Sequence, residues 1–437
     1  MLLINLLLLL LLFLILFVEV NRINRLKIDG LTFFNFWFLI VFVLVPFLIL
    51  NFGSNFAHPT FYYLSLKGNI VIVLTIIIFY FSMIFAYYLT PNTNVILKTS
   101  SNKNKYILFT ILLTVLAIIG AYIFIDSYGG LSNLVSNVNT IRNGTLERNT
   151  FGAFFGLFGN YIVILFWSYL LYLINKRKFN FKIIFLFGLS IYWLFLRGSR
   201  GSFIDLFLIS YAIIVLKTQR YHIKLLALIV PISIFILLYG KSIFVSLDLG
   251  YQGIFDLIKD LNQNTTFLES IQSVIHNFAH PFMSLNLSFD KVETLKDYRY
   301  FKDIPNAFIF YLQLIGFERP DTITYLNTEY VIGRYESNIP PGIIAFGYYS
   351  LGVFGVLLTG AILGIFIKFI DSIYKNSKPS NEDKFLTVIY LIFISSIGQF
   401  IIVGDIRVTI IQEFHNIILI LLYLMIFCKF YKKRVDV

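Results

Sequence analysis

Two arginines in the turn Arg197-Gly198-Ser199-Arg200-Gly201 have the clearest capacity for chemistry in this chain. Paired guanidinium groups are natural ligands of phosphate, because each planar group donates several hydrogen bonds in a fixed geometry. Gly198 and Gly201 permit a tight turn and let a ligand approach the backbone closely. Apolar segments at 183–196 and 202–216 flank the turn, so both arginines stand at the ends of expected membrane spans. The pattern indicates an anion site.

The segments beside this turn have about 14 and 15 residues, fewer than the roughly 20 that a full span needs. We therefore expect the turn to lie below the extracytoplasmic surface of the membrane and to line a cavity. An alternative remains open, in which the two arginines reach out to lipid headgroups. Asp205 stands about one turn inside the second segment, where it could hold one arginine by a salt bridge.

Two histidines, His276 and His280, lie four residues apart in the stretch 267–280, which has the pattern of an amphipathic helix. This spacing lets both rings face one cavity, and histidine can act as a general base near neutral pH. We expect Pro281 to end this helix. A two-histidine metal pair and an ordinary wet helix face are the alternatives. The metal reading lacks the glutamate of the HExxH pattern and a third ligand.

Arg334 and Glu336 precede the turn Pro340-Pro341-Gly342, which leads into a Gly- and Tyr-rich apolar stretch. We expect these two side chains at the rim of the same cavity, or else in a plain turn at the membrane surface. Asp405 and Arg407 stand two residues apart and most simply pair with each other. Small residues at positions 347, 352 and 355 allow close helix packing, but a plain membrane-entry turn is the favoured explanation of these glycines.

The composition indicates that a membrane protein carries these groups. The 437 residues are 58% hydrophobic and only 13% charged, and a soluble protein of this size cannot bury so much apolar surface. The fold class expected is an all-α polytopic membrane protein. The net charge of +12 reflects loops facing an anionic leaflet, so it does not indicate nucleic acid binding. With Cys428 as the single cysteine, no disulfide framework is expected.

About eleven transmembrane helices are expected, with spans near 2–20, 31–52, 69–90, 106–126, 152–174, 183–196, 202–216, 224–246, 343–370, 385–404 and 409–428. Lys and Arg gather in alternate loops, which predicts that the N-terminus is outside and the C-terminus inside. The segments expected in the cytoplasm are 21–30, 91–105, 175–182, 217–223, 371–384 and the tail. The chain then divides into eight spans over 1–246, a large extracytoplasmic loop over 247–342, and three spans with a short tail over 343–437.

The whole arrangement resembles the bacterial O-antigen and capsule repeat-unit polymerases of the Wzy type, which are related to the O-antigen ligases. The resemblance is carried by the number of spans, the RGSRG turn at 197–201 and one dominant outer loop before the last three spans. The segment NIPPGIIAFGYYSLGVFGVLLTG at 338–360 also matches the Pro/Gly-rich stretch of such enzymes. Leu287 stands where the ligases carry a glycine after their histidine, and this departure favours polymerase over ligase.

This resemblance implies a metal-independent, inverting glycosyltransferase that needs no cofactor. It would join oligosaccharide repeat units, carried on undecaprenyl pyrophosphate, outside the bacterial cytoplasmic membrane. The residues implied to hold the pyrophosphate are Arg197, Arg200 and Arg334. The candidates implied to deprotonate the acceptor hydroxyl are His276, His280 and Glu336.

The partners implied are the lipid-linked oligosaccharide donor and acceptor, membrane lipids, a chain-length regulator and a flippase, with no nucleic acid. Two competing functions remain. One is a related ligase-like transferase of lipid-linked glycans, and the other is a transporter of repeat units. The absence of internal repeats and the single large outer loop count against the transporter. Whether the polymer is O-antigen, capsule or another exopolysaccharide stays open.

Overall fold

The structure, a computed structural model, describes residues 1–22, 27–57, 59–61, 69–99, 102–143, 150–176, 180–248, 267–295, 298–309, 321–334, 339–377 and 385–432. About 86% of it is helical. Eight helices are long and apolar enough to cross a membrane, and a bent pair over 406–427 can form a ninth span. Two shorter apolar helices accompany them, over 182–196 and 223–239. These features confirm the expected all-α polytopic membrane protein.

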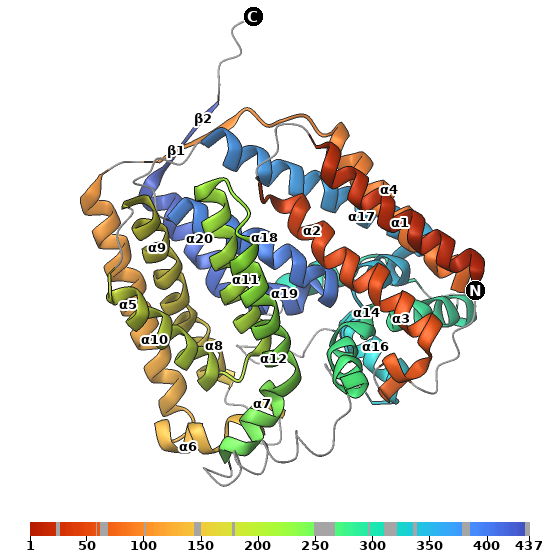
Figure 1. The fold of residues 1–437 in the computed structure, drawn as a ribbon, viewed down its shortest axis with the longest axis horizontal. Coiled ribbons are helices and arrows are strands. Elements are labelled where there is room, and N and C mark those ends of the chain that lie inside the picture. Colours follow the sequence, from red (N-terminus) through yellow and green to blue (C-terminus); the bar gives the residue numbers. More distant parts are fainter. Residues whose placement is uncertain are drawn as a thin grey trace, which may run out of the picture. The chain divides into compact units, whose positions relative to one another are not determined.

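Contacts within the chain define two compact units. The first comprises Met1–Asn94, Ile271–Lys375 and Phe393–Glu413. Its elements are α1 (Leu2–Asn21), α2 (Gly30–Leu39), the π-helix η1 (Ile40–Leu44), α3 (Val45–Phe52), the 3-10 turns η2 (Ser54–Phe56) and η3 (Pro59–Phe61), α4 (Asn69–Leu89), most of α14 (Phe267–Leu295), α15 (Asp303–Ile309), α16 (Ile323–Ile332), α17 (Ile343–Ser377), the end of α18 (Phe385–Val403) and α19 (Ile406–Gln412) (Figure 1).

The second unit comprises Val95–Ser270, Asn376–Ile392 and Phe414–Val437. Its elements are β1 (Val95–Thr99), α5 (Lys103–Asp126), α6 (Leu131–Ser136), α7 (Val138–Asn143), α8 (Thr150–Gly156), the 3-10 turn η4 (Phe158–Asn160), α9 (Tyr161–Lys176), α10 (Lys182–Leu196), α11 (Arg200–Thr218), α12 (Ile223–Asp248), the start of α18, α20 (Phe414–Phe427) and β2 (Cys428–Lys432) (Figure 1). The strands β1 and β2 pair antiparallel, with Thr99 opposite Cys428.

A buried ion cluster joins α1 to α2 in the first unit. Nη1 of Arg22 donates to both carboxylate oxygens of Asp29 at 2.9 Å, and Nη2 donates to those of Glu19 at 3.0 Å. Burial alone lowers the pKa of Arg22, but Asp29 and Glu19 outweigh it and raise that pKa above its usual value. Asp29 also caps α2, because its Oδ1 accepts from the backbone N–H of Thr32 at 2.9 Å.

The expected end of a helix at Pro281 is wrong, because α14 continues through that residue to Leu295. An interior proline leaves one backbone hydrogen bond unmade, so tertiary packing has to compensate. Residues 281–288 are all buried, and the Pro281 ring packs closely on Gly342. The burial of residues 281–288 therefore sustains the helix through Pro281, an effect that the helix propensities of single residues do not predict.

The helix α17 consists of two helices separated by a break at Leu351 and Gly352. The backbone N–H groups of residues 299 and 300 donate to the carbonyls of residues 349 and 350, both at 3.0 Å. These bonds satisfy carbonyls that the break would otherwise leave without partners. Beyond the break the helix turns back on itself, because a Cβ on Gly355 would lie 2.0 Å from the carbonyl oxygen of Gly347. Gly347 and Gly355 thus make the close contact that small residues allow, whereas Gly352 faces Tyr298.

The eight residues before this break, Ile343–Ser350, are all buried in the first unit. They form a short helix that follows the Pro-Pro-Gly turn and does not continue straight into the long apolar helix after Gly352. The long helix then packs on α4, where Gly364 approaches the carbonyl oxygen of Met83. The span expected over 343–370 is thus a short buried helix followed by a longer one.

Candidate functional site

The turn between α10 and α11 is shaped by Gly198. Its φ is +60°, a left-handed conformation that glycine adopts without steric cost. The N–H of Gly198 donates to the carbonyl of Phe195 at 2.9 Å, and the N–H of Ser199 donates to that of Leu194 at 3.4 Å. This pair of bonds is a Schellman motif, which closes α10 and lets α11 begin at Arg200. A Cβ on Gly201 would meet nothing within 4 Å, so the backbone there is open.

Arg197 is half-buried at this turn and is held by a side chain from η4. Its Nη1 donates to Oδ1 of Asn160 at 2.9 Å. The same oxygen accepts from Nε1 of Trp193 at 3.0 Å. Trp193 is buried and packs so closely on Gly159 that a Cβ there would lie 2.0 Å from the indole ring. The guanidinium is therefore oriented by an amide whose own position is fixed by packing.

The other end of the Asn160 amide faces His415 on α20. Nδ2 of Asn160 lies 3.2 Å from Nε2 of His415. Since Oδ1 already accepts from Arg197 and Trp193, the NH₂ group must face the ring, and it donates to Nε2. A nitrogen that accepts carries no proton, so the hydrogen bonds assign a neutral His415 whose proton is on Nδ1. The hydroxyl of Tyr161 also donates to the carbonyl of His415, at 2.8 Å.

Three elements of the second unit thus bring together an arginine, an amide and a neutral histidine. A guanidinium can hold an oxyanion, and a neutral imidazole can take up or pass on a proton. This combination is the chemistry required for displacing a phosphate-type leaving group by a hydroxyl. His415, which is 6% exposed, was not among the residues expected from the sequence. One signal pointed to it, since ionisable residues inside an apolar span tend to be functional.

The other residues expected at the turn are described in part. Asp205 lies half-buried on α11, and Arg200 is the first residue of that helix. The side chain of Arg200 lies outside what the structure describes. Arg334 is exposed in the first unit, one residue beyond Gly333, which ends α16 in a left-handed conformation. Glu336 lies outside the described residues.

His276 and His280 both lie on α14, in the first unit, four residues apart as expected. Nε2 of His276 lies 2.9 Å from the backbone carbonyl of Asn55. A carbonyl only accepts, so Nε2 carries a proton in this contact. In the described part of the chain, no group of three His, Cys, Asp or Glu side chains could hold a metal ion.

A second polar centre surrounds the start of α16. Asp303 accepts from Nε of Arg299 at 2.8 Å and from the N–H of Ile323 at 2.6 Å. Asp321 accepts from the same guanidinium at 2.9 Å. Burial lowers the pKa of Arg299, but the two carboxylates overcome this effect and raise it above its usual value. This cluster fixes the N-terminus of α16 to Arg299, which lies in the segment that bonds to the carbonyls at the α17 break.

The expected pair of Asp405 and Arg407 is wrong. Asp405 caps α19 instead, with Oδ1 accepting from the N–H of Val408 at 3.1 Å. Its Oδ2 accepts from the hydroxyl and the N–H of Thr324. The carboxylate is used by two helix starts because backbone N–H groups there have no partner inside their helix. Arg407 makes no ion pair with a described residue.

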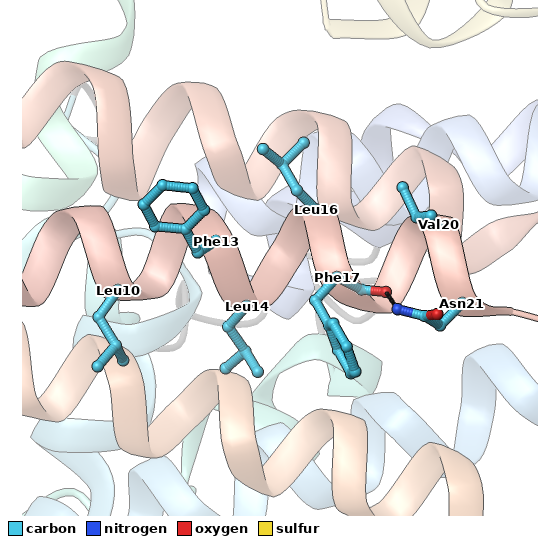
Figure 2. Close-up of a pocket in the computed structure, with 7 residues that line it drawn as sticks. All are labelled: Leu10, Phe13, Leu14, Leu16, Phe17, Val20 and Asn21. Atoms are coloured by element: carbon cyan, nitrogen blue, oxygen red, sulfur yellow. Dashed lines mark hydrogen bonds between the residues drawn. The ribbon is translucent and has the colours of Figure 1, made fainter.

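A groove on α1 has a volume of about 570 Å³ (Figure 2). The residues that line it are Leu10, Phe13, Leu14, Leu16, Phe17, Val20 and Asn21. The amide of Asn21 donates to the carbonyl of Phe17 at 2.9 Å. With no titratable side chain in its lining, the groove cannot perform acid–base chemistry, and its surface suits lipid tails.

Comparisons with known protein families, with curated proteins and with solved structures find no match for this chain.

Proposed function

We propose that this chain is a polysaccharide polymerase of the bacterial cytoplasmic membrane. It would join oligosaccharide repeat units carried on undecaprenyl pyrophosphate, on the extracytoplasmic side, to build an O-antigen, capsule or exopolysaccharide. The observation that carries the proposal is the contact of Asn160 with both Arg197 and His415. This contact couples an anion-binding group to a proton acceptor, as the displacement of a pyrophosphate by a sugar hydroxyl requires.

In the proposed reaction the acceptor hydroxyl attacks the anomeric carbon of the donor sugar from the side opposite the pyrophosphate. One C–O bond forms, the bond to the pyrophosphate oxygen breaks, and the configuration inverts. Arg197 and Arg200 hold the departing pyrophosphate, with Arg334 as a further candidate. A general base takes the hydroxyl proton. The candidates for it are His276, His280 and Glu336, to which we add His415.

The proposed topology has eleven spans, with the N-terminus outside and the C-terminus inside. The eight long apolar helices, the bent pair and the two shorter helices supply that number. Contacts between segments expected on one side support it. Asp371 accepts from the N–H of Gly30 at 2.9 Å, and β1 pairs with β2. All four of these segments are expected in the cytoplasm from their Lys and Arg residues.

Contacts at the other end of the helices support the same topology. Asn55 and His276 are both expected outside, and they meet in a hydrogen bond. The N–H of Gly342 donates to the carbonyl of Val403 at 3.1 Å, joining the end of the large outer segment to the outer end of α18. Asn160, Arg197 and His415 also stand at ends of helices that this topology places outside. The proposed site would therefore face the extracytoplasmic side, with membrane lipids around it.

A transporter of repeat units is the second candidate function, and broken helices favour it. The helix α17 breaks at residues 351 and 352, and a break also separates α19 from α20. Discontinuous spans are common around the binding sites of secondary transporters. A ligase-like transferase of lipid-linked glycans would use the same Arg and His chemistry. Both functions predict surface polysaccharides that differ from those of a polymerase mutant.

The deciding experiment deletes the gene and measures the length distribution of the surface polysaccharide. If the chain is a polymerase, its deletion leaves single repeat units in place of long chains. Loss of all surface sugar indicates transport, and free polymer without its anchor indicates a ligase. Either of these two results would refute the proposal.

Complementation tests the site itself. Arg197→Ala and Arg200→Ala are expected to leave single repeat units at a normal protein level. Arg220→Ala is the matched control, because Arg220 is an exposed arginine of the expected cytoplasmic loop 217–223. Restoration of long chains by Arg197→Ala and Arg200→Ala would remove the two arginines from the proposed mechanism.

A further inference from the structure

Arg407 is a buried arginine, and two of its three side-chain nitrogens have no acceptor among the described residues. Only 1% of its surface is exposed, and its Nε and Nη1 make no hydrogen bond with any described residue. These two atoms carry three N–H groups. Among the described residues, the guanidinium of Arg407 interacts with the ring of Tyr325, whose centroid lies 5.4 Å from the guanidinium carbon. A buried cation of this kind is costly unless something negative completes its surroundings.

The carboxylates close to Arg407 in the sequence and the fold are already engaged. Asp405 uses both oxygens on Thr324 and Val408, as the N-terminal cap of α19. Asp303 accepts from Arg299 and from the N–H of Ile323. Two helix starts and a second arginine therefore hold the local carboxylates, and the guanidinium of Arg407 lies beyond ion-pair distance of both.

A second unsatisfied group lies at the same end of α16. Thr322 is the N-cap residue of that helix and is fully buried, but its hydroxyl makes no hydrogen bond with a described residue. An N-cap threonine ordinarily bonds the first N–H groups of its helix. Here Asp303 and Asp405 take the N–H groups of Ile323 and Thr324, so the hydroxyl is left over. Tyr325, which contacts Arg407, follows Thr322 by about one helical turn.

We propose that Arg407 and Thr322 form a buried binding site for an oxyanion of the phosphate class, with the Tyr325 ring holding the guanidinium in place. A guanidinium donates two parallel hydrogen bonds to the oxygens of a phosphate, and a hydroxyl donates a third. Such a ligand supplies both the missing charge and the missing acceptors. The phosphate could belong to a lipid headgroup or to a soluble molecule. The site goes beyond the proposed function, because it does not depend on which reaction the chain catalyses.

The test measures thermal unfolding of the purified full chain in an uncharged detergent at constant ionic strength. One arm adds inorganic phosphate in exchange for chloride. The other adds phosphatidylglycerol to the micelles, compared with diacylglycerol. We expect one of these additions to raise Tm by about 2–4 °C, because a ligand that binds only the folded state stabilises it. A rise with inorganic phosphate identifies a soluble anion, and a rise with phosphatidylglycerol alone identifies a lipid.

Variants assign the effect to the site. Arg407→Met should abolish the rise in Tm, and it should unfold at a higher temperature than the wild type when no anion is added, because a buried unmatched charge is gone. Arg220→Met is the matched control at an exposed arginine and should keep the rise. If Arg407→Met does not fold, Thr322→Val tests the site instead, and we expect the added anion to raise its Tm by less than it raises that of the wild type. The proposal is overturned if neither addition raises Tm of the wild type, or if the rise is unchanged in these site variants.

Discussion

The side-chain oxygen of Asn160 lies 2.9 Å from Nη1 of Arg197, so one amide orients the arginine that the sequence marks as an anion ligand. A fixed direction of the guanidinium matters for any anion held at this turn, because a small misplacement of a positioning group reduces the rate strongly. Asn160 is a positioning residue in this scheme. Its second contact, with His415, extends the same constraint to the proton acceptor.

Asn160→Ala is therefore expected to shorten the surface polysaccharide to single repeat units. It removes the acceptor for Arg197 and Trp193, which should also lower the stability by about 1–3 kcal/mol. Chain length and Tm of the purified protein are the two measurements. Asn133→Ala serves as the control, since Asn133 is an exposed asparagine of the same unit.

Asn160→Asp separates the two contacts of this amide. A carboxylate still accepts from Arg197, but it has no N–H to donate to Nε2 of His415. If the histidine takes part in the reaction, chain length should fall in this variant while Arg197 keeps its position. Long chains in Asn160→Asp together with short chains in Asn160→Ala would leave the arginine contact as the functional one and remove His415 from the candidates.

The sequence predicts the apolar helices well because each span must satisfy its own backbone inside a membrane. The turn at Gly198 follows from glycine chemistry in the same way. What could not be predicted depends on tertiary packing. Pro281 lies inside a helix because its neighbours are buried, and Asp405 binds Thr324, more than eighty positions earlier in the chain, in place of nearby Arg407. His415 gains its partner from a distant 3-10 turn, which local patterns do not report.

Gly355→Ala tests the reversal of direction inside α17. The added Cβ would lie 2.0 Å from the carbonyl oxygen of Gly347, and backbone cannot move aside as a flexible side chain can. We expect a loss of about 1–3 kcal/mol, the usual cost of overpacking, measured as a lower Tm and a lower protein level. Gly188→Ala is the matched control, because a Cβ there meets nothing within 4 Å. Equal stability of the two variants would contradict the close packing of the two parts of α17.

Arg22→Gln tests the buried ion cluster between α1 and α2. Loss of this guanidinium leaves the carboxylates of Glu19 and Asp29 without their shared cation, and breaking a buried pair in this way costs about 3–5 kcal/mol. A large drop in Tm is expected. Lys103→Gln removes one positive charge from an exposed position and should leave Tm nearly unchanged. A similar small effect of both substitutions would show that the cluster contributes little.

Thr99→Cys tests whether the segments before α5 and after α20 lie on the same side of the membrane. Thr99 stands opposite Cys428, the single native cysteine, in the β1–β2 pair. Directly opposed residues of antiparallel strands have Cα atoms about 4.5–5.5 Å apart, a separation that a disulfide can bridge. An oxidant should therefore produce an internal disulfide in this variant, seen as a mobility shift on a non-reducing gel. Lys98→Cys is the control, because position 98 pairs with position 429 and not with Cys428. Cross-linking in Lys98→Cys but not in Thr99→Cys would show that the register is shifted. Cross-linking in neither variant would contradict the pairing, and with it the support it gives to placing both segments in the cytoplasm.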